Sequence, residues 1–97
     1  MLRHVVLLKF LDDVPAAEID AIAVALRELP HVVDSIRDYT VGRDLGISDG
    51  ASDLVVIGGF DDMDGYAHYR DHPSHQAVVT ERVLPKLASR SAAQFEY

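Results

Sequence analysis

The chain has 97 residues, 48% of them hydrophobic, and its 16 acidic and 9 basic side chains give a formal net charge of −7. Such a surface cannot neutralise phosphates, which excludes nucleic-acid binding and association with an anionic membrane. The absence of cysteine excludes disulfides, thiol catalysis and Cys-based metal sites. No apolar run approaches the roughly 20 residues of a membrane span, and the short N-terminal run stops at Lys9. We therefore expect one cytoplasmic domain over residues 1–97.

The first predicted element is a strand over residues 2–11, followed by a helix over residues 14–30. The strand has two apolar faces: one carries Leu2, His4, Val6, Leu8 and Phe10, and the other Val5, Leu7 and Leu11. A strand of this kind is buried on both sides. In the helix, Pro15 suits the first turn, and the apolar residues that recur at helical spacing are Ile19, Ile22, Leu26 and Leu29.

Two further strands are predicted in the middle of the chain. Residues 36–43 alternate weakly, as in a strand near a sheet edge, and residues 44–52 form a turn-rich loop. Residues 53–60 are again apolar on both faces. The Gly58-Gly59 pair in this strand indicates a bulge or a close approach of another backbone.

The last third predicts two helices and a strand. A short helix over residues 61–72 begins at Asp61 or Asp62 and is broken by Pro73, which disfavours helical geometry at the residue before it. Ser74 is the expected N-cap of the next helix. We expect Pro85 to kink or fray that helix before Leu87, and residues 91–97 to form the final strand.

The order β-α-β-β-α-β predicts a ferredoxin-like α+β fold, in which helices cover one face of a four-stranded antiparallel sheet. The helices leave the other face uncovered. The apolar residues of that face are Val5, Leu7, Val55 and Ile57. We therefore expect the chain to form a homodimer through this sheet face.

Three segments resemble the stress-responsive A/B barrel (Dabb) family: RHVVLLKF at 3–10, VGRD at 41–44 and YRDHPSHQAVV at 69–79. The resemblance extends over all 97 residues. It implies a ferredoxin-like protomer whose sheet packs on a partner's sheet in a dimeric α/β barrel. The family includes proteins without an assigned activity, plant stress-associated proteins, and polyketide cyclases such as olivetolic acid cyclase.

The resemblance also implies site residues. The catalytic histidine of the cyclase falls on His75, its tyrosine on Tyr69, and a pocket histidine of its first strand on His4. The pocket wall differs, because the cyclase has aromatic residues or a histidine at three positions that are here Ala23, Leu26 and Leu54. A long alkyl-resorcylic substrate is therefore not expected.

The residue types suit proton transfer beside a carbonyl group. His75 lies in the first turn of a predicted helix, where the macrodipole disfavours imidazolium and so favours a neutral general base. Tyr69 is a donor for a developing enolate oxygen. We expect cofactor-free cyclisation or isomerisation of a small carbonyl or aromatic metabolite. The residues expected to contact the substrate are Val6, Leu8, Phe10, Ile22, Leu26 and His72.

Other interpretations remain open. Tyr69 and His75 also suit a structural joint between two helices, and His4 a satisfied core residue, in a non-catalytic stress-associated or ligand-binding homodimer. His68 and His72 share a helix face, and with His75 they suggest a metal site. The predicted helix break separates His75 from that pair, so we expect no metal and no cofactor.

Overall fold

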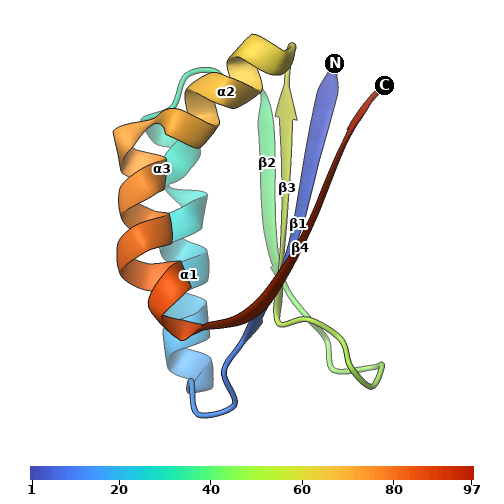
Figure 1. Ribbon diagram of the computed structural model, residues 1–97, viewed down its shortest axis with the longest axis vertical. Helices are drawn as coiled ribbons and strands as arrows, with labels where there is room; N and C mark the ends of the chain where they lie inside the picture. Colours follow the sequence, from blue (N-terminus) through green and yellow to red (C-terminus); the bar gives the residue numbers. More distant parts are fainter.

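The computed structural model describes residues 1–97 and has a single sheet with helices on one face (Figure 1). The antiparallel strand order is β2-β3-β1-β4, with β2 and β4 at the edges, which confirms the predicted ferredoxin-like α+β fold. No helix is both long enough and apolar enough to cross a membrane. The main elements are β1 (Leu2–Phe10), α1 (Ala16–Arg27), β2 (Asp38–Arg43), β3 (Leu54–Phe60), α2 (Met63–Asp71), α3 (Pro73–Val78) and β4 (Leu87–Glu96).

The two faces of the sheet differ as the alternation along β1 predicts. The residues of β1 that face the helices are buried: Leu2, His4, Val6, Leu8 and Phe10. They pack against the apolar face of α1, which buries Ile19, Ile22 and Leu26. Burial of this apolar area is the main favourable contribution to folding.

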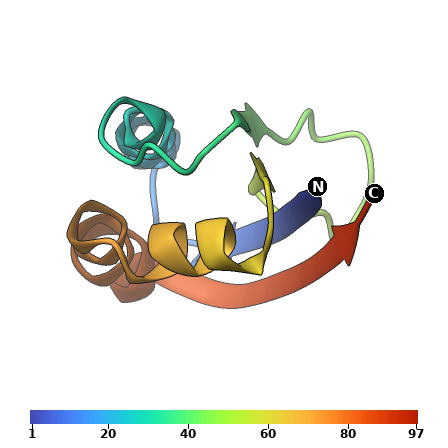
Figure 2. The ribbon, with the colours of Figure 1, turned by 90° about the horizontal axis from the view of Figure 1, so that it is seen from above.

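The other face of the sheet is not covered within the protomer. Val5 pairs with Ile57 and Leu7 with Val55 in the β1–β3 ladder, so these four side chains form one patch, which we call the outer patch. Leu7 is 41% exposed. All helices lie on the opposite side (Figures 1 and 2).

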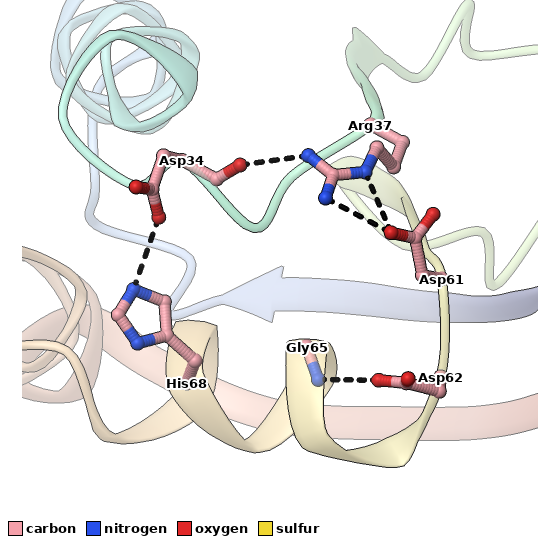
Figure 3. A network of polar contacts seen from close by, with 6 residues as sticks. All are labelled: Asp34, Arg37, Asp61, Asp62, Gly65 and His68. Atoms are coloured by element: carbon pink, nitrogen blue, oxygen red, sulfur yellow. Dashed lines mark hydrogen bonds and ion pairs between the residues drawn. The ribbon is translucent and has the colours of Figure 1, made fainter.

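A short polar network fixes the start of α2 (Figure 3). Asp62 is the N-cap and its Oδ1 accepts a hydrogen bond from Gly65 N–H at 2.9 Å. Arg37 donates to the Asp61 carboxylate at 2.9 Å and to the Asp34 carbonyl at 2.8 Å. The hydrogen bond from Arg37 holds the pKa of Asp61 below its usual value. The segment before β2 is thereby tied to the end of β3.

The joint between α2 and α3 differs from the prediction in its cap. His72 has an extended backbone, as expected before a proline, and separates the two helices. The N-cap of α3 is His72, not Ser74, because the His72 Nδ1 accepts a hydrogen bond from the Ser74 N–H at 3.1 Å. Pro73 occupies the first helical position and places the cap one residue before it.

The helical segment becomes irregular around Pro85 and ends before Leu87, as predicted, but the last strand begins earlier than predicted. Pro85 has no N–H to donate to the carbonyl four residues earlier, and the chain passes through a π-helical turn (Val79–Val83) and a 3₁₀ turn (Leu84–Lys86). Strand β4 starts directly after them at Leu87, four residues earlier than predicted, and Leu87 pairs with Phe10.

The glycine pair of β3 forms no bulge, because the β1–β3 register is continuous, and the atoms that approach it belong to side chains and not to another backbone. A Cβ at Gly59 would collide with the Asp38 carboxylate. A Cβ at Gly58 would lie 3.1 Å from the ring of Phe60 and 3.4 Å from that of Tyr39. The missing side chain at Gly58 leaves room for these aromatic rings on the helix-facing side of the sheet.

Candidate functional site

A cavity of about 80 Å³ lies between the sheet and the helical segment that follows α2. It is small compared with the roughly 300–1,000 Å³ of pockets for drug-sized ligands. Its wall is mostly apolar, with four polar side chains. The residues that line it are His4, Val6, Leu8, Leu26, Val56, Tyr69, His75, Val79, Val83, Leu84, Leu87 and Arg90.

His75 is held in one tautomer by the backbone. Its Nδ1 lies 2.9 Å from the carbonyl oxygen of Arg70. A carbonyl can only accept, so Nδ1 carries the proton and the Nε2 of the neutral ring is unprotonated. Burial is the main cause that lowers the pKa of His75. The neutral imidazole therefore has a free basic nitrogen near pH 7.

Tyr69 lies beside this imidazole, with the two ring centroids 4.3 Å apart. Its side chain is buried, and its hydroxyl oxygen lies 2.8 Å from that of Tyr39 on β2. Burial raises the pKa of Tyr69 to about 12 and raises that of Tyr39 as well. Both phenols keep their protons near pH 7. When Tyr39 donates to Tyr69, the Tyr69 proton is free for another acceptor.

His4 lies on β1 and is only 4% exposed. Its Nδ1 is 3.2 Å from Gln94 Oε1 on β4, and its ring packs near Tyr66 and Tyr69. Burial lowers the pKa of His4. His4 lines the cavity and also has a hydrogen-bond partner within the protein, so its position does not distinguish between the two predicted roles.

The structure separates the predicted substrate contacts into two groups. Val6, Leu8 and Leu26 line the cavity. Three other predicted contacts, Phe10, Ile22 and His72, do not. Phe10 and Ile22 belong to the buried core, and the ring of His72 accepts a hydrogen bond from the Ser74 N–H as the helix cap.

Three polar residues near the site were not predicted from the sequence: Tyr39, Arg90 and Gln94. Tyr39 lies in a predicted strand, but its hydroxyl partner, Tyr69, comes from α2. Arg90 and Gln94 face the helices because they pair with Leu8 and His4 in the β1–β4 ladder. That register was the only signal for them, and the predicted strand began after Arg90.

The histidines near the helix joint do not converge. His68 Nε2 lies 3.5 Å from Asp34 Oδ1, His72 caps α3, and His75 is bonded to the Arg70 carbonyl. No group of three or more His, Asp or Glu side chains is arranged to hold a metal ion.

The two cavity histidines predict a pH dependence of stability. Their pKa values are lowered in the folded protein, mainly by burial, so the unfolded chain takes up protons first as the pH falls through about 6.5. The free energy of unfolding should therefore decrease from about pH 7.5 to about pH 5.5. Urea unfolding at the two pH values measures this, and the double variant His4→Gln/His75→Gln should show a smaller decrease. An equal decrease in both proteins would contradict the assignment.

These features define a ferredoxin-like α+β protein with a cavity between its sheet and its helices. The sequence model of the stress responsive A/B barrel domain family matches residues 2–97, and the chain belongs to this family.

Individual relatives support the fold. The "Uncharacterized protein SCO4036" of Streptomyces coelicolor is 32% identical over 99 residues, which cover 100% of both chains. A dimeric ferredoxin-like protein of unknown function from Thermobifida fusca is 34% identical, with a TM-score of 0.90 over 99% of this chain and 90% of that one. A hydroxynitrile lyase from Passiflora edulis is 15% identical, with a TM-score of 0.84 over 97% and 90%.

Proposed function

We propose that the cavity binds a small carbonyl compound and that His75 and Tyr69 catalyse proton transfer at the carbon next to its carbonyl group. The observation that carries this proposal is the bond from His75 Nδ1–H to the Arg70 carbonyl. It leaves an unprotonated, basic Nε2 on His75, and both His75 and Tyr69 line the cavity. The hydroxynitrile lyase from Passiflora edulis supports the proposal in one respect, because it is an enzyme with the same fold.

The residues have complementary roles in this reaction. His75 Nε2 takes a proton from the α-carbon, and the electron pair of the broken C–H bond moves onto the carbonyl oxygen as an enolate. The Tyr69 O–H, which keeps its proton near pH 7, donates a hydrogen bond to that oxygen. The imidazolium then returns the proton to the same or another carbon, or the enolate attacks a second carbonyl in a cyclisation. No cofactor is required.

The volume of the cavity narrows the class of substrate. About 80 Å³ holds only a ligand of a few heavy atoms. Leu26 of α1 is buried and forms part of the wall, so α1 bounds the cavity. We therefore favour enolisation or isomerisation of a short-chain ketone over cyclisation of a long polyketide.

Exchange of α-protons for deuterium tests the proposal without knowledge of the natural substrate. In D₂O, ¹H NMR follows the loss of the α-proton signal from a panel of small ketones and oxo acids. The wild-type protein should accelerate exchange of at least one member. The Tyr69→Phe variant should lower that rate by about 10²-fold, as expected for the loss of one oxyanion donor.

Tyr39→Phe is the matched control for this prediction. Either substitution removes one hydroxyl of the Tyr39–Tyr69 pair and leaves the other buried and unpartnered, which costs about 1–3 kcal/mol of stability. Of the two tyrosines, only Tyr69 is among the residues that line the cavity. Equal rates in the two variants would contradict the role of Tyr69 as the enolate donor.

A non-catalytic ligand-binding protein is the second candidate, and one observation favours it. The polar groups of the site also satisfy one another, because His75 bonds to backbone and Tyr69 bonds to Tyr39. A joint between helices needs the same contacts. Absence of exchange across the whole panel, together with ligand-induced shifts of the cavity resonances, would favour this candidate.

We further propose that the functional unit is a homodimer that buries the outer patch in a dimeric α/β barrel. The loop between β2 and β3 extends on the same uncovered side of the sheet (Figures 1 and 2). Its Leu45 and Ile47 are 84% and 83% exposed. Exposed apolar side chains beside an uncovered apolar face mark a protein interface.

A further inference from the structure

Arg90 is the single permanent cation among the residues that line the cavity. It pairs with Leu8 in the β1–β4 ladder, and paired residues point to the same face, so its side chain lies on the helix-facing side. The residue is exposed whereas His4 and Tyr69 are buried. Arg90 therefore lies at the rim of the cavity and the two aromatic side chains lie at its floor.

No carboxylate of the protein neutralises this guanidinium. Arg3, Arg37, Arg43 and Arg70 each form an ion pair with an aspartate. Arg90 forms none, although the chain has 16 acidic and only 9 basic side chains. An arginine without an acidic partner at the edge of an apolar cavity is available for an external anion.

The positive charge of Arg90 acts on the other polar groups of the cavity. Burial is the largest cause that lowers the pKa of His4 and His75, and the charge of Arg90 lowers both further. Burial raises the pKa of Tyr69, and Arg90 partly opposes that effect. Arg90 is thus close enough to the proposed reaction centre to interact with a charge that forms there.

We propose that the ligand of this cavity is a short-chain oxo acid, whose carboxylate pairs with Arg90 while its ketone lies between His75 and Tyr69. This inference rests on the proposed function and specifies its substrate class. A planar guanidinium matches the two oxygens of a carboxylate, and the apolar wall strengthens the attraction by lowering the local dielectric constant. Arg90 also stabilises the negative charge that enolisation adds.

Pairs of oxo acids and their neutral amides provide the test, because the two members of a pair have nearly the same size and shape. Pyruvate and pyruvamide, and acetoacetate and acetoacetamide, are titrated into the full chain, and NMR follows the cavity resonances. The wild-type protein should bind at least one acid about ten-fold or more tightly than its amide, a difference of about 1.4 kcal/mol. Arg90→Gln should abolish this preference. Arg82→Gln removes an exposed arginine that does not line the cavity and should retain it.

A second readout requires no ligand. Because Arg90 lowers the pKa of His75, the His75 pKa should rise in Arg90→Gln and stay unchanged in Arg82→Gln.

The outcomes separate the inference from the function on which it rests. Equal affinity for acid and amide in the wild-type protein, or an acid preference that survives in Arg90→Gln, overturns the role of Arg90 and leaves proton transfer on a neutral ketone intact. If neither acids nor amides bind and the exchange panel is silent, the proposed function fails, and the inference fails with it.

Discussion

The His75→Ala variant should lose about 10²-fold or more of the α-proton exchange rate, the usual contribution of a positioned general base. The imidazole of His75 is the proposed base. Its tautomer is fixed because Nδ1–H donates a hydrogen bond to the Arg70 carbonyl. His4 also lines the cavity, but it is only 4% exposed, whereas His75 is partly exposed and easier for a ligand to reach. We therefore expect His4 to replace the base poorly. Exchange of the most reactive panel member in D₂O measures the loss.

His31→Ala is the control for this experiment, because His31 is an exposed residue of the 3₁₀ turn Leu29–His31, outside the cavity. The His31→Ala variant should catalyse α-proton exchange at the wild-type rate. The wild-type rate should rise with pH and level off above the pKa of His75, which burial keeps below 6.5. A folded His75→Ala variant that keeps the wild-type rate would show that YRDHPSH is a joint between helices and not a base.

Leu7→Asp should convert the protein from a dimer to a monomer at micromolar concentration. Leu7 belongs to the outer patch, beside Val5 and opposite Val55, and is 41% exposed. In a twofold-symmetric interface one substitution introduces two buried carboxylates without partners, each costing about 3 kcal/mol or more. The two together cost about 6 kcal/mol or more, so the dissociation constant should increase by about 10⁴-fold or more. The variant should also unfold at a lower temperature, because a chain of this size has a limited core of its own.

Light scattering coupled to size exclusion measures the mass of both proteins. Val24→Asp is the matched control, since Val24 is 55% exposed on α1, on the side of the protomer away from the outer patch. It should remain a dimer. A wild-type protein that is monomeric throughout the micromolar range would contradict the proposed interface.

The regular strands and helices could be predicted because the apolar or polar character of each residue there matches the burial of its position. Alternation in β1 distinguishes a face buried under helices from the outer patch, and the spacing of Ile19, Ile22 and Leu26 defines the buried face of α1. Pro73 breaks the helix at His72 for a purely local steric reason. These features do not depend on which segments meet in space.

The start of β4 could not be predicted in the same way. Residues 88–90 read Ala-Ser-Arg and lack apolar alternation, because the helix-facing side of β4 at Arg90 forms the rim of a cavity and not the core. The prediction of Ser74 as the N-cap of α3 was wrong because residue type alone does not decide between two possible caps. Ser74 and His72 both offer a capping atom, and the backbone around Pro73 selects His72.

The full set of site residues could not be predicted, because several of them are brought together by contacts between segments that are distant in the sequence. His75, Tyr69 and His4 were expected from resemblance to the family, and the structure places all three around one cavity. Local sequence could not identify Tyr39 or Arg90, because one approaches Tyr69 from β2 and the other reaches the cavity through its register with β1. The expected contacts Phe10 and Ile22 share the correct face but lie in the packed core.

Direct observation of the His75 ring is the most decisive measurement, because the proposed chemistry requires a neutral imidazole with an unprotonated Nε2. Long-range ¹H–¹⁵N NMR correlations of the histidine side chains distinguish the two neutral tautomers and the imidazolium. At about pH 7 we predict that His75 is neutral with its proton on Nδ1, and that its pKa lies below 6.5. A His75 that is protonated on Nε2 at that pH, whether as the other neutral tautomer or as imidazolium, would contradict its role as the base.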